Sequence, residues 1–123
     1  MRINYTIVFV SDMERSVAFY RDVVGAPLKF ESPEWTEFAT AGATLALHKS
    51  DGPPPDGDMR RSKSPGQCRP GLQVPDLDVF HDRMVENNVV CVQEPAVSFG
   101  ARIAQYVDPD GLVFSVSEAR DGK

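Results

Sequence analysis

Residues 3–10 are rich in β-branched and aromatic side chains and read as a β-strand, in which successive residues point to opposite faces. One face of this strand carries only large apolar side chains: Ile3, Tyr5, Ile7 and Phe9. The other face includes Val8 and Val10. Because both faces carry apolar groups, we predict that this strand is covered on both sides.

After the strand, the apolar spacing changes to that of a helix. Ser11 and Glu14 form a capping-box signature for a helix start. One apolar stripe then recurs at spacings of four, three and four residues: Met13, Val17, Tyr20 and Val24. Gly25 supplies a left-handed stop. The pattern predicts one helix up to Gly25.

The remaining segments continue as short strands and one more helix. Residues 28–31, 35–39 and 43–48 read as strands, and the proline- and glycine-rich residues 49–66 read as a linker. A strand at 69–74 precedes a helix that Asp76 caps and that ends near Asn87 and Asn88. The apolar stripe of this helix is Leu77, Phe80 and Met84. The last three strands are expected at residues 89–93, 101–107 and 112–117. Asp108-Pro109-Asp110-Gly111 is predicted to form a tight turn.

The second half of the chain repeats the first. Residues 10–14, Val-Ser-Asp-Met-Glu, recur as residues 74–78, Val-Pro-Asp-Leu-Asp, and the apolar strand after Gly42 recurs after Gly111. The repeat predicts an α+β fold of two βαβββ modules in pseudo-two-fold arrangement, with an eight-stranded mixed sheet around a cavity. We expect one domain over residues 1–123, with module one at 1–48, the linker at 49–66 and module two at 67–120.

Charge and cysteine content narrow the function classes. A net charge of −5 argues against binding to a nucleic-acid backbone, which needs clustered Lys and Arg. No apolar run is long enough for a membrane span, and the N-terminal residues lack the apolar core of a signal peptide. Cys68 and Cys91 have no metal-site or redox-motif spacing, so we expect two reduced thiols in a cytoplasmic protein.

Two segments carry a resemblance to a known family. Residues 10–25, VSDMERSVAFYRDVVG, resemble the first helix of the vicinal oxygen chelate superfamily, and Asp108-Pro109-Asp110-Gly111 before an apolar strand is similar to its last turn. The superfamily includes glyoxalase I, bleomycin-resistance proteins, fosfomycin-resistance transferases and extradiol dioxygenases. The resemblance implies the paired-module fold over residues 3–118 and a homodimer.

In metal-dependent members of the superfamily, four strands each supply one ligand to a divalent ion. Counting from the matching Asp and Gly residues places these positions at Tyr5, Ala46, Arg69 and Ser115. Alanine has no donor atom, and a guanidinium would repel a dication. We therefore expect no metal and no other cofactor.

The cavity face is expected to offer an organic-ligand site in place of a metal. Ligand-binding candidates are Arg69, Tyr5, His48, Ser115, Trp35, Phe9 and Gln73. Arg69 would hold a carboxylate or phosphate, unless it pairs with an internal carboxylate or lies at the surface. His48 is a candidate general base, with a rim position as its alternative. Tyr5 either donates a hydrogen bond to a ligand oxygen or packs, and Trp35 belongs either to the core or to a stacking surface. Phe38 lies on a strand that could add to the wall.

Three functions fit these residues. The first is a metal-free protein that sequesters a small organic molecule in the inter-module cavity, as bleomycin-resistance proteins do. The second is a glyoxalase-like lyase, isomerase or dioxygenase with a non-standard metal site or none, in which His48, Tyr5 and Glu118 supply donors. The third is a regulatory or interaction module without a dedicated ligand.

Overall fold

The computed structural model describes residues 1–50, 68–98 and 100–119. The chain forms two compact units, Met1–Asp56 and Gly57–Lys123, hereafter unit 1 and unit 2. Each unit contains one copy of the repeat.

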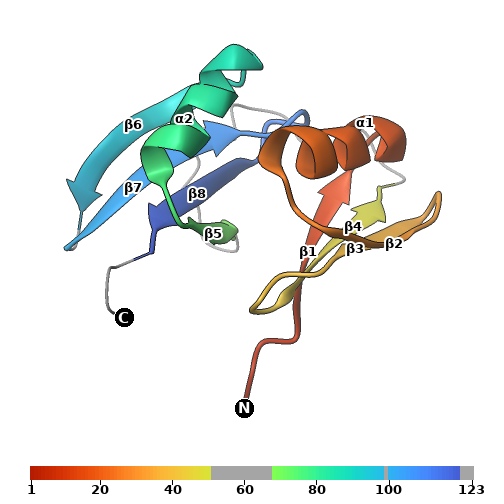
Figure 1. The fold of residues 1–123 in the computed structure, drawn as a ribbon. Helices are drawn as coiled ribbons and strands as arrows, with labels where there is room; N and C mark the ends of the chain where they lie inside the picture. Colours follow the sequence, from red (N-terminus) through yellow and green to blue (C-terminus); the bar gives the residue numbers. More distant parts are fainter. Residues whose placement is uncertain (51–67, 99, 120–123) are drawn as a thin grey trace. The chain divides into compact units, whose positions relative to one another are not determined.

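Unit 1 contains β1 (Tyr5–Val10), α1 (Met13–Ala18), η1 (Phe19–Val24), β2 (Leu28–Glu31), β3 (Trp35–Phe38) and β4 (Thr44–Lys49) (Figure 1). Its sheet has the strand order β1-β4-β3-β2. β1 runs parallel to β4, whereas β3 runs antiparallel to both β4 and β2.

Unit 2 repeats this arrangement with β5 (Gly71–Val74), α2 (Leu77–Glu86), β6 (Cys91–Ser98), β7 (Ala101–Val107) and β8 (Val113–Glu118). The strand order is β5-β8-β7-β6, with β5 parallel to β8 and the other pairs antiparallel. The predicted α+β fold of two βαβββ modules is therefore confirmed. The eight strands are divided between two four-stranded sheets.

The two helices begin in the same way. Asp12 is the N-cap of α1, and its Oδ1 accepts a hydrogen bond from the Arg15 amide at 3.1 Å. Asp76 caps α2 by accepting from the Val79 amide, also at 3.1 Å. The prediction was right for Asp76, but Asp12 caps the first helix in place of Ser11, because the aspartate is the residue with extended backbone before the first helical turn.

The first helix changes its winding half-way. α1 has ordinary helical geometry, and η1 continues it as a π-helix that ends at Gly25, whose φ of 91° is left-handed as predicted. The whole predicted stripe is buried despite the change: Met13, Val17, Tyr20 and Val24.

The core of each unit lies between its helix and one face of its sheet. In unit 1, Val8, Val10, Phe38, Leu45 and Leu47 are buried on that face. In unit 2, the α2 stripe is buried together with Tyr106, Phe114 and Val116. α1 contacts β4, and α2 contacts β6, β7 and β8.

The other face of β1 is open. Tyr5 is 50%, Ile7 40% and Phe9 64% exposed, so the prediction that β1 is covered on both faces is wrong. The four-stranded sheet has only one helical layer to cover it, and large apolar side chains remain accessible on the opposite face. Among the described residues, no helix is both long and apolar enough to cross a membrane.

Candidate functional site

The strand register of unit 1 gathers the candidate residues on the open face of its sheet. Tyr5 lies opposite Thr44, Ile7 opposite Ala46 and Phe9 opposite His48. On the neighbouring strand, Trp35 lies opposite His48 and Glu37 opposite Ala46. Register partners share a face of a sheet, so all these side chains leave the same surface.

Four of these side chains form a continuous aromatic cluster: Tyr5, Trp35, His48 and Phe9. The Tyr5 and Trp35 ring centroids are 6.2 Å apart at an interplanar angle of 69°. Trp35 and His48 are 6.0 Å apart at 89°, and His48 and Phe9 are 5.4 Å apart at 47°. These edge-to-face and tilted contacts are the favoured aromatic geometries, so the rings hold one another in place.

His48 is held in one orientation within this cluster. Its Nδ1 lies 2.7 Å from the Lys49 carbonyl oxygen, which only accepts, so Nδ1 is the donor. The Nε2 atom has no hydrogen-bond partner in the part of the chain that the structure describes. A neutral imidazole in this tautomer presents Nε2 as an acceptor.

Glu37 is the functional candidate that the sequence analysis missed. Its Oε2 accepts a hydrogen bond from Trp35 Nε1 at 2.8 Å, and its Oε1 lies 3.8 Å from Lys29 Nζ. The available signal was the two-residue spacing of Trp35 and Glu37, which places both on one face of a strand. Phe38 is fully buried on the opposite face and does not contribute to this wall.

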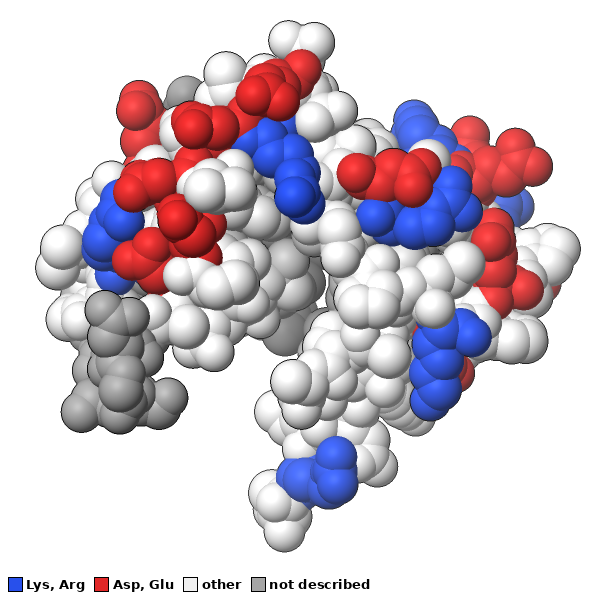
Figure 2. Space-filling view, viewed as in Figure 1, with Lys and Arg blue, Asp and Glu red and all other residues white. Residues whose placement is uncertain are grey.

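A pocket of about 350 Å³ opens beside the aromatic cluster. It is lined by Asn4, Tyr5, Trp35, Glu37 and Thr44, all from unit 1. Figure 2 shows few charged side chains over β1, so the surface there is mainly uncharged. The pocket thus combines aromatic walls with one carboxylate.

The candidates in unit 2 have a different setting. Gln73 and Ser115 lie on the face of the sheet that also carries Gln105 and Ser117. Gln105 Nε2 approaches Ser115 Oγ at 3.5 Å, and Ser117 Oγ donates to the Leu72 carbonyl at 3.4 Å. This face carries amides and hydroxyls, together with Ile103 opposite Ser117.

Arg69 lies two residues before β5 and is half-buried. Within residues 1–50, 68–98 and 100–119, no carboxylate forms an ion pair with it. The strand expected at residues 69–74 is shorter in the structure: β5 begins at Gly71, where its pairing with β8 begins. Contact between Arg69 and a ligand stays a prediction.

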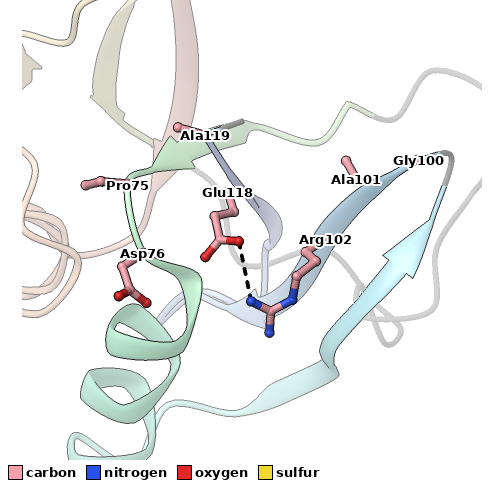
Figure 3. Close-up of a pocket in the computed structure, with 7 residues that line it drawn as sticks. All are labelled: Pro75, Asp76, Gly100, Ala101, Arg102, Glu118 and Ala119. Carbon is pink, nitrogen blue, oxygen red and sulfur yellow. Dashed lines mark hydrogen bonds and ion pairs between the residues drawn. The ribbon is translucent and has the colours of Figure 1, made fainter. Parts of the chain in front are cut away.

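A second pocket, of about 470 Å³, lies at the start of α2 (Figure 3). Arg102 points toward Glu118 there, with 3.4 Å between Nη1 and Oε1, and its Nη2 donates to Asp78 Oδ1 at 2.8 Å. The other Glu118 oxygen accepts from the Leu77 amide at 3.0 Å. Arg102 thus forms ion pairs with Asp78 and Glu118, and Glu118 accepts a hydrogen bond from the N-terminus of α2. These contacts indicate a structural role. Glu118 lies on the helix side of its sheet with Val116, so it is not a donor on the open face.

His81 and Cys91 are two further titratable groups of unit 2. His81 Nδ1 lies 2.9 Å from the hydroxyl of the buried Tyr106, and burial raises the pKa of that phenol. Burial also raises the pKa of the Cys91 thiol, which makes it a poor nucleophile near neutral pH. Asp and Glu side chains gather on the surface over α2 in Figure 2.

Comparison with known proteins identifies the family of this chain. The model of the Glyoxalase/Bleomycin resistance protein/Dioxygenase superfamily matches residues 2–116. The chain belongs to this superfamily. It is 28% identical over 114 residues to the phenazine antibiotic resistance protein EhpR of Enterobacter agglomerans, covering 92% of this chain and 88% of that protein.

Solved structures of superfamily members have the same fold. TnmS3, an antibiotic binding protein from Streptomyces sp. CB03234, is 28% identical with a TM-score of 0.72, covering 98% of this chain and 97% of that one. A glyoxalase/dioxygenase from Nostoc punctiforme is 18% identical with a TM-score of 0.79, covering 98% and 92%. The second likeness concerns the fold alone.

The superfamily's metal positions do not fit a metal in this chain. Ala46 is fully buried and has no donor atom, and Arg69 precedes β5. The described residues contain no group of three His, Cys, Asp or Glu side chains close enough to hold an ion. A divalent ion needs several such donors at about 2.0–2.2 Å, and a phenol and a hydroxyl do not replace them.

Proposed function

We propose that this superfamily member binds and sequesters a small planar organic molecule at the aromatic cluster of unit 1, without a metal. The observation that carries the proposal is the continuous set of Tyr5, Trp35, His48 and Phe9 beside a pocket, in which Trp35 is half-buried and the other three rings are exposed. The names of EhpR and TnmS3 support a resistance or antibiotic-binding role.

The physical argument rests on the exposure of these rings. Phe9 is 64% and Tyr5 50% exposed, so a planar ligand would remove apolar ring surface from water. Each aromatic contact adds about 0.5–1.5 kcal/mol beyond burial, and the rings are already ordered by one another. Little ordering is therefore left for the ligand to impose.

A homodimer is also part of the proposal. Ile3 is 74% and Phe30 53% exposed, and a partner subunit would cover such apolar side chains. Sedimentation at several protein concentrations tests this separately from ligand binding.

The test of binding uses Trp35, the only tryptophan in the sequence, as its reporter. Titration with phenazine should quench or shift its fluorescence to saturation at one equivalent per chain, and the phenazine should be recovered unchanged by mass spectrometry. Calorimetry on Trp35→Ala should show at least about a tenfold loss of affinity, because the central ring is removed. Saturable binding that is unaffected in Trp35→Ala would contradict the proposed site.

A second candidate, a cofactor-independent lyase or isomerase, is favoured by the orientation of His48. Its Nε2 is the acceptor that a general base needs. In this case a substrate would be converted and His48→Ala would abolish the conversion. Elemental analysis of protein purified without chelator addresses the metal: a stoichiometric Mn, Fe, Ni or Zn content would contradict the metal-free proposal.

A further inference from the structure

The pocket beside Trp35 contains one charged group whose role the aromatic cluster does not explain. The Glu37 side chain is 29% exposed and lies on the open face of the sheet, opposite Ala46 and among the ring-bearing residues. A carboxylate in an aromatic pocket loses part of its hydration, and this costs free energy unless a partner replaces the water.

The contacts of Glu37 leave part of its capacity unused. Oε2 accepts from Trp35 Nε1 at 2.8 Å. Oε1 lies 3.8 Å from Lys29 Nζ, a distance beyond a hydrogen bond, and the Lys29 side chain is 59% exposed. An ion pair of this kind contributes little and is readily exchanged. A carboxylate has about four acceptor sites, so Glu37 can accept from a ligand as well.

The hydrogen bond from Trp35 Nε1 to Glu37 also favours the binding of a cation to the face of the indole ring. Tryptophan is the side chain whose ring face attracts cations most strongly. Donation from the indole N–H to a negative acceptor polarises the ring and increases the negative charge of its face. The Glu37 carboxylate and the Trp35 indole therefore both favour a positively charged ligand, and so does the protein's net charge of −5.

We infer that the pocket lined by Tyr5, Trp35 and Glu37 selects planar aromatic cations, and that Glu37 sets this preference. The inference rests on the proposed function and specifies the ligand class of the same site. Glu37 acts in two ways: it pairs with the positive nitrogen of the ligand and fixes the indole on which the ligand stacks.

The test compares three probes of similar shape: N-methylacridinium, a permanent cation; acridine, neutral at mildly alkaline pH; and anthracene-9-carboxylate, an anion. Dissociation constants are measured by Trp35 fluorescence and by calorimetry at low ionic strength. Wild-type protein should bind the cation at least about tenfold more tightly than acridine, the size expected for a charge-assisted contact. The anion should bind most weakly.

Two variants and one matched control sharpen the test. Glu37→Gln keeps an acceptor for the indole but removes the charge, so it should abolish the cation preference and leave acridine affinity within about twofold. Lys29→Gln removes the competing ammonium and should strengthen cation binding by about two- to threefold. Glu31→Gln makes the same charge change opposite the buried Thr36, on the other face of the sheet, and should alter nothing.

The outcomes separate this inference from the proposed function. Equal affinity for cation and acridine, tighter binding of the anion, or a preference retained in Glu37→Gln would overturn the inference and leave aromatic binding intact. Failure of all three probes to bind would contradict both. A cation preference lost equally in Glu31→Gln would show that net charge, and not the position of Glu37, is responsible.

Discussion

The two repeats have matching helix-covered faces and contrasting open faces. Asp12 and Asp76 cap their helices with nearly identical backbone angles, −137° and 105° against −140° and 105° in φ and ψ. The open face of unit 1 carries the aromatic cluster and Glu37, whereas that of unit 2 carries polar amides and hydroxyls: Gln73, Gln93, Gln105, Ser115 and Ser117. The repeat therefore retains the residues that build the module and differs in those available for binding.

The physical reason is the different demand on the two faces. The helix-covered face must exclude water, which restricts it to well-packed apolar side chains. The open face has no helix of its own unit against it, so its residues can change without loss of the core. In this account, unit 1 holds the ligand-binding surface and unit 2 repeats the scaffold with different chemistry.

The largest expected effect contrasts the two faces of the unit 1 sheet. Phe38→Ala should lower the free energy of unfolding by about 3–5 kcal/mol, because it empties a fully buried ring position. Phe9→Ala, at a side chain 64% exposed, should cost less than about 1 kcal/mol and weaken ligand binding. Chemical denaturation measures both, and equal losses would show that the open face also belongs to the core.

The helix caps test whether the two repeats are equivalent. Asp12→Ala and Asp76→Ala should each lower the free energy of unfolding by about 1 kcal/mol, because each removes a hydrogen bond to a first-turn amide. The matching Asn variants keep the acceptor and should recover most of the loss. A loss confined to one repeat would contradict equivalent capping.

Ser16 marks a position where the helix-covered faces differ. It lies four residues after Asp12, as the buried Phe80 lies four after Asp76. Its buried Oγ has no hydrogen-bond partner among the described residues. Ser16→Ala removes an unsatisfied hydroxyl and should raise the free energy of unfolding by up to about 1 kcal/mol. A decrease of that size would mean that the hydroxyl has a partner, such as a bound water.

The smallest effect concerns pH and the Arg102 ion pairs in unit 2. The hydrogen bond from Arg102 lowers the pKa of Asp78 below its ordinary value. Stabilisation by a carboxyl with a lowered folded-state pKa is present above the unfolded value, about 3.9, and is lost as the pH falls through the folded value. Asp78→Asn should therefore lower the melting temperature slightly at neutral pH and not at all at strongly acidic pH. A difference that persists in acid would assign the effect to packing.

The sequence predicted the fold from features that act locally. The buried stripes, Asp76, Gly25 and the Asp108 turn depend on neighbouring residues; Asp108 is buried, and its Oδ1 accepts from the Asp110 and Leu112 amides at 2.9 Å. The strand expected at residues 89–93 was predicted to end at Gln93, yet β6 continues to Ser98. β6 is an edge strand with register shifts around Pro95, where the missing N–H is tolerated.

The site depends on contacts between strands, which spacing predicts only in part. Alternation placed Tyr5, Phe9 and His48 on one face, and the register then brought Trp35 to His48. The role of Glu37 could be recognised only from its hydrogen bond with the Trp35 indole, and the π-helical winding of η1 only from the backbone geometry. Neither feature has a distinct signal in the sequence. Ligand roles for Arg69, Gln73 and Ser115 stay predictions.

The most direct test of the central claim is a two-dimensional ¹H–¹⁵N spectrum recorded during titration with N-methylacridinium. The single tryptophan gives one indole N–H resonance, and this is the proton that Trp35 donates to Glu37. The account predicts that this resonance shifts to saturation together with amides of β1, β3 and β4. Binding that leaves the indole resonance unmoved and shifts amides at the Arg102 pocket instead would contradict it.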